Sequence, residues 1–176
     1  SIALDSALDR TALLAGAMIR TFSKFSASDT QHIMDVLSKA SNDTALSFSK
    51  LETSLPIVAG AANAVGISFT RTVALLGALS NAGIDAHMSA TALRNIFIDS
   101  RRKGHSYDQV LENIGKHVDT LTPAFDKFGR RTAVSAQILV RNLKEVAAED
   151  LILQKTDYGY TATLAATRLN TYQGSL

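Results

Sequence analysis

The chain has 176 residues, which is enough for one domain with a substantial buried core. Aliphatic side chains dominate an apolar fraction of 46%, aromatic residues make up only 6%, and Trp is absent, a composition typical of closely packed helices. The absence of cysteine excludes disulfide and thiolate chemistry, and a formal charge of +2 does not indicate a broadly basic surface.

The N-terminal part of the chain predicts two helices. The first spans residues 4–25, and the charges of Asp5, Asp9 and Arg10 exclude a secretory signal peptide there. Residues 26–29 form a loop that caps the second helix. The positions predicted to face inward are Leu4, Leu8, Ala12, Ala15, Ile19, Ile33, Val36 and Leu37. Because the chain begins with Ser, we expect it to be a fragment of a longer protein.

The central segment, residues 49–97, holds the longest apolar run of the chain. Ser49 with Glu52 is a capping-box pattern, in which a hydroxyl and a carboxylate each satisfy a free backbone N–H at the start of a helix. Pro56 has no N–H to donate and predicts a bend or a restart of this helix.

Two glycines divide the central segment into three helices. Gly66 and Gly83 are each placed to end a helix in a left-handed cap, and Ser68 can cap the helix between them. A third helix follows over residues 86–101. The short connections predict that neighbouring helices pack antiparallel.

An uncharged hairpin is the sharpest functional candidate in the sequence. Charged residues are absent between Glu52 and Arg71 and between Arg71 and Asp85, so each run approaches the length of roughly 18 residues that a membrane-spanning helix needs. The two glycine stops and Pro56 favour a buried helical core instead. The apolar positions of this hairpin are Leu55, Val58, Val65, Phe69, Val73, Leu76 and Leu79.

The remainder of the chain also predicts helices. Ser106 caps a short helix that ends near residue 117, and Pro123 starts another, in which Gly129 predicts a kink or an interruption. Helical patterns follow at 133–140 and 143–154, the latter with Leu143, Val146, Ala147 and Leu151 facing inward. We therefore expect an all-α, compact multi-helix domain with short loops over residues 1–158. Residues 159–176 would begin a C-terminal helix that continues into a long coil.

No pattern in the sequence predicts catalysis, a cofactor or a metal site. The four histidines are scattered, without the convergent spacing that metal ligands need. Neither a nucleophile elbow nor a phosphate-binding glycine loop is present. The basic clusters 101–103 and 130–131 are short and have acidic neighbours, so we interpret them as helix-end charges rather than as a specific nucleic-acid site. We expect a protein that is not an enzyme.

The order and spacing of several segments resemble a known family. Leu55–Ser68, Thr72–Gly77, Asn81–Ile84 and Thr91–Asn95, followed by Phe128–Arg131 and Thr171–Leu176, closely resemble the core region of phage tail tape measure proteins. The resemblance runs from about Ala12 onward, and it lies in the order of these segments rather than in any single motif.

This resemblance implies a structural module that lies in the lumen of the virion tail tube after assembly in the host cytoplasm. It implies roles in tail assembly, length determination and genome ejection. The implied partners are other copies of the chain, the tail tube protein and tail assembly chaperones, with transient contact to the host membrane and no specific nucleic acid.

Two other interpretations remain open. The chain could be a stand-alone helical adaptor that binds a partner protein, or the hairpin could become membrane-active when it is released at infection. In every case the residues that we expect to matter are structural: Pro56, Gly66, Gly83, Arg94 and Gly129. The three glycines would hold backbone geometry that a side chain disfavours. Arg94 is a single charge within an otherwise apolar stretch, and we expect it to pair with a carboxylate or a helix end.

Overall fold

A computed structural model describes residues 2–116, 132–156 and 159–160, with the side chains of 2–8 and 114–116 left aside. Every regular element in these ranges is a helix, which confirms the all-α prediction. The elements are α1 (Ile2–Thr21), the 3-10 helix η1 (Ala27–Asp29), α2 (Thr30–Asp43), α3 (Phe48–Ala64), α4 (Phe69–Asn81), α5 (Ala86–Lys103), α6 (Tyr107–Lys116), a helical segment at 132–141, and α8 (Leu143–Gln154). The predictions for Pro123 and Gly129 lie outside the described residues.

Hydroxyl and carboxylate side chains define where the central helices begin. The hydroxyl of Ser68 accepts a hydrogen bond from the backbone N–H of Arg71, as predicted. The preceding helix starts earlier than the proposed capping box, because Ser47 and not Ser49 is its N-cap. Pro56 does not restart that helix either, since α3 continues past it with the proline exposed on the surface.

Glycines define where these helices end. Gly66 and Gly83 adopt φ angles of 77° and 81°, in the left-handed region. In both caps the N–H of the residue after the glycine donates back to the last turn of the helix, with Ile67 N to Ala62 O at 2.9 Å and Ile84 N to Leu79 O at 3.0 Å. The two predicted stops are therefore confirmed.

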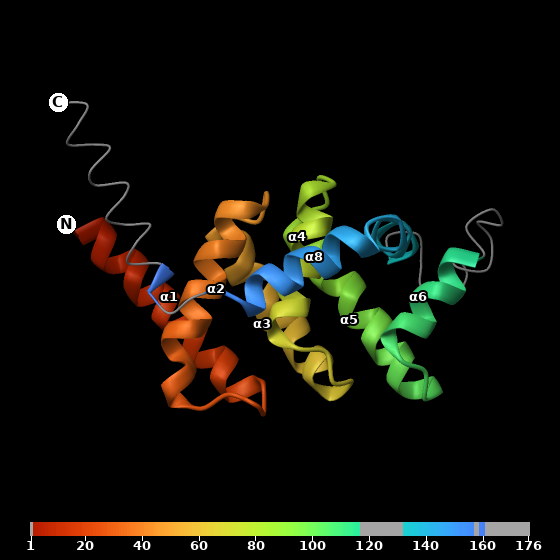
Figure 1. Ribbon diagram of the computed structural model, residues 1–176, viewed down its shortest axis with the longest axis horizontal. Coiled ribbons are helices and arrows are strands. Elements are labelled where there is room, and N and C mark those ends of the chain that lie inside the picture. Colours follow the sequence, from red (N-terminus) through yellow and green to blue (C-terminus); the bar gives the residue numbers. More distant parts are fainter. Residues whose placement is uncertain (1, 117–131, 157–158, 161–176) are drawn as a thin grey trace.

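Helix α4 lies at the centre of the fold. Its residues are buried from Phe69 to Ser80, except for Arg71 and Ala78, which are half-buried. Helices α8, α3, α5 and α2 all pack on it, while α3 and α5 make the most extensive helix pair. In Figure 1, α1 and α2 lie at one end, α6 lies at the other, and α8 crosses back over α4. The uncharged central run is thus the core of the domain.

The inward faces of the outer helices differ in part from the prediction. In α1 the buried residues include Leu14 and Met18, whereas Ala12 is exposed. In α8 only Val146 and Leu153 are buried. The predicted inward positions Leu143, Ala147 and Leu151 are exposed, because α8 has apolar residues on both sides and its periodicity does not single out one face.

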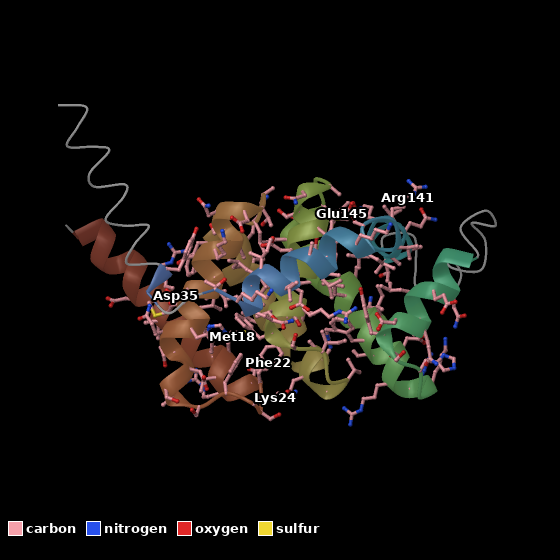
Figure 2. The ribbon with its side chains drawn as sticks, in the orientation of Figure 1. Met18, Phe22, Lys24, Asp35, Arg141 and Glu145 are labelled. Atoms are coloured by element: carbon pink, nitrogen blue, oxygen red, sulfur yellow. The ribbon has the colours of Figure 1, made fainter. Side chains whose placement is uncertain are left out.

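The end of the described chain returns to the first helices. The carboxylate of Asp35, fully buried in α2, accepts hydrogen bonds from the backbone N–H of Gly159 at 2.7 Å and from the Gln31 amide at 3.0 Å. The ammonium of Lys39 lies over the ring of Tyr160, 5.2 Å from its centroid. In Figure 2 Asp35 lies beside the short segment at 159–160. The domain boundary proposed at residue 158 stays a prediction.

Candidate functional site

The apolar hairpin is assembled from α3 and α4 and faces inward. Six of its seven predicted positions are at most 2% exposed, and Val65 is half-buried. Phe69, at the start of α4, packs edge-to-face against Phe22 and Phe25, with 5.7 Å between ring centroids in both pairs. The folded domain therefore buries the hairpin, and membrane activity would require the domain to open.

None of the helices that the structure describes combines the length and apolar character that a membrane span requires. The membrane-active hairpin accordingly remains a hypothesis about an opened state rather than about this fold.

A pocket with a mixed apolar and polar lining lies beside the aromatic cluster. It has a volume of about 430 Å³ and lies between the end of α1, the α3–α4 turn and the end of α8. Phe22, Phe25 and Phe69 line it, with Lys24 and Asn63 among its polar residues. Figure 2 shows Phe22 and Lys24 near one another at the end of α1. The amide oxygen of Asn63 accepts from Ser23, which joins α1 to the end of α3.

A second concave surface lies between α3 and α5, and we name it the α3–α5 groove. Its floor combines Gly60, Ala61 and Ala64 of α3 with Ile98 of α5, and its volume is about 610 Å³. It brings the C-terminal part of α3 beside the C-terminal part of α5, so these two helices run in the same direction. A Cβ built on Gly60 would meet no heavy atom within 4 Å, which shows that the floor is open.

Three arginines of α5 form the rim of the groove: Arg94, Arg101 and Arg102, all exposed. Arg102 bonds to the carboxylate of Asp99 at 3.1 Å. Within the part of the chain that the structure describes, neither Arg94 nor Arg101 forms an ion pair, so the carboxylate partner expected for Arg94 is not found there. No carboxylate of that part lines the groove. The rim is therefore a positively charged surface beside an apolar floor.

The predicted structural residues are thus dispersed rather than gathered in one site. Gly66 and Gly83 end helices, Pro56 is on the surface of α3, and Arg94 is on the rim of the groove. Gly129 lies outside the described residues. Sequence patterns had assigned Arg101 and Arg102 to helix-end charge, and nothing local indicated that α5 would place them along α3.

Two ionisable side chains are perturbed by packing. Burial of Tyr107 raises the pKa of its phenol, while the cation of Arg71, 5.5 Å from the ring centroid, acts in the opposite direction. Partial burial of Glu149 on α8 raises the pKa of its carboxyl, and the nearby charge of Asp43 raises it further. Neither group contributes to the pKa shift of the other, so the two are perturbed independently.

The described ranges do not form a metal site, because no three His, Asp or Glu side chains converge in them.

A family model of phage-related minor tail proteins matches residues 1–151. The chain belongs to this family. No curated protein and no solved structure matches the chain. As a member of a phage tail family, this all-helical domain has a structural role in the tail.

Proposed function

We propose that this member of the minor tail protein family is a module of a tail tape measure protein, a protein that acts in tail assembly and length determination. The observation that carries the proposal is the family match over residues 1–151. The choice of a tape measure protein within this family comes from the segments that resemble tape measure proteins, which include the α3–α4 hairpin. The proposed location is the lumen of the tail tube, with the tail tube protein and assembly chaperones as partners.

The fold bears on what such a module could do. A continuous helix advances about 1.5 Å per residue, so an extended chain would convert its length directly into tube length. Helices α3, α4 and α5 instead end at left-handed glycines, and α3 and α5 both pack on α4. This compact arrangement supports a role as an anchor or as a packing unit between copies, rather than as a stretch of straight rod.

The test is an in-frame deletion of residues 2–176 from the phage gene that encodes the chain, followed by electron microscopy of the tails. Normal-length tails that assemble or eject DNA poorly would support a compact module. Tails shortened by up to roughly 260 Å, the fully helical length of the segment, would show that it lies stretched along the tube. A matched control replaces the segment with an unrelated helical sequence of equal length. Infectious phage with normal tails after the deletion would contradict the proposal.

The adaptor alternative makes a different prediction about the gene. If the chain is part of a tape measure protein, the reading frame continues far beyond Leu176 in Ala-rich helical sequence. A reading frame that ends close to Leu176 would favour the adaptor.

A further inference from the structure

An occupant of the α3–α5 groove would need two chemical properties to match its lining. Its small floor residues Gly60, Ala61 and Ala64 leave room for a protruding apolar side chain. Its rim carries Arg94 and Arg101, which lack an ion pair within the described ranges. A carboxylate close to the apolar side chain would therefore complement the groove in both shape and charge.

Helix α1 of the same chain presents this combination on its outer side. Leu13 is 73% exposed, more than the other large apolar side chains that the structure describes. Asp9 is exposed one helical turn before it, and the exposed Ala12 lies between them. Positions three and four residues apart share one face of a helix, so these residues form a continuous patch that we name the α1 stripe. Arg10 is not part of this patch, since it pairs with Glu52 of α3.

A second exposed apolar surface of the described chain, on α8, does not match the groove. On α8, Leu151 and Ile152 are 50% and 45% exposed. Lys144 and Lys155 are exposed on that side of the helix, and their charges would oppose the arginines of the groove. Glu145 is the exposed carboxylate of α8, whereas Glu149 and Asp150 are half-buried. The charges around the exposed apolar residues thus make the α1 stripe, rather than α8, complementary to the groove.

We propose that the α1 stripe of one copy of this chain docks into the α3–α5 groove of the next copy. Leu13 fills the space above Gly60 and Ala64, and the carboxylate of Asp9 pairs with Arg94 or Arg101. The stripe and the groove are different surfaces, so the contact is heterologous and adds copies head to tail. The inference rests on these two surfaces and not on the tape measure assignment.

The absence of native cysteine allows a direct test by cross-linking the full chain. A Leu13→Cys chain is mixed with an Ala64→Cys chain under mild oxidation. We expect disulfide-linked heterodimers in large excess over either homodimer, and a ladder of multimers when one chain carries both substitutions. Leu151→Cys in place of Leu13→Cys is the matched control and should yield no excess. Homodimers of Leu13→Cys alone, or equal yields from the Leu151→Cys control, would overturn the proposal.

A charge exchange tests the role of the arginines separately by sedimentation velocity. The unmodified chain should associate as its concentration rises and dissociate in added salt, because salt screens exposed ion pairs. Arg94→Glu with Arg101→Glu, and separately Asp9→Arg, should each weaken self-association about tenfold or more. Mixing these two variants should restore association between them. A chain that stays monomeric at every concentration, or variants that associate as the unmodified chain does, would contradict the docking model. Failure of this test would leave the tail-length experiment unaffected.

Discussion

The buried carboxylate of Asp35 accepts a hydrogen bond from the backbone N–H of Gly159, 124 residues further along the chain, at 2.7 Å. This contact attaches the end of the described chain to α2. Because a buried polar group that loses its hydrogen bond is costly, the contact ties the end of the described chain to α2 energetically as well as geometrically.

Asp35→Ala should lower the free energy of unfolding by about 1–3 kcal/mol, since it removes a buried acceptor and leaves the Gly159 N–H without this bond. Urea denaturation measures the change, and hydrogen exchange of the Gly159 amide should accelerate. Asp108→Ala is the control, because its exposed pair with Arg71 contributes at most about 1 kcal/mol. Equal losses in the two variants would show that Asp35 does not anchor the segment.

Gly83→Ala should destabilise the domain by about 1–2 kcal/mol, because a side chain disfavours the φ of 81° that ends α4. Gly60→Ala provides a control of opposite sign. This glycine is inside α3 with open space around it, so alanine should stabilise by about 0.5–1 kcal/mol. Thermal unfolding of both variants in dilute solution tests the pair. A melting temperature unchanged by Gly83→Ala would count against the left-handed cap.

Tyr107→Phe should leave the melting temperature unchanged or raise it. The phenol oxygen is buried without a hydrogen-bond partner among the described residues, so its removal eliminates an unsatisfied polar atom. The ring contacts with Phe97 and Arg71 would be retained. A marked loss of stability in this variant would show that the hydroxyl has a partner after all.

The raised pKa of Tyr107 predicts that the domain loses stability in alkaline solution. The pKa of Tyr107 is raised in the folded state, so above the ordinary value of 10.0 the unfolded chain releases this proton first. The free energy of unfolding should therefore fall as pH rises beyond that value, and Tyr107→Phe should reduce the slope. Denaturation curves at several alkaline pH values test this, and equal slopes for both proteins would contradict it.

Glu149→Gln should stabilise the domain at neutral pH. The pKa of Glu149 is raised by partial burial and then by Asp43, so its ionised form is disfavoured in the folded state. A raised pKa means that stability is greatest below the ordinary value of 4.5 and declines as pH rises through the folded-state pKa. The advantage of glutamine over glutamate should thus shrink in acid. Glu145→Gln, at an exposed position, should change stability by less than about 0.5 kcal/mol.

The parts of the fold that sequence could predict are those with local causes. The stops at Gly66 and Gly83 depend on a backbone conformation that glycine favours, and the cap at Ser68 depends on a hydroxyl three residues before an N–H. The prediction of which face of α8 points inward was wrong, because both of its faces carry apolar residues. The Asp35–Gly159 contact and the α3–α5 groove could not be predicted, since each joins segments that are distant in the sequence.

The return of the chain to α2 also determines how the domain would respond to force. The start of α1 and the Gly159–Tyr160 segment lie at the same end of the molecule (Figure 1). Tension between them would therefore load the Asp35–Gly159 bond first and then peel helices away from that end one after another. Shearing all the contacts of α4 at once would demand far more force. A domain connected in this way would unravel from one end under a steady pull on the two segments.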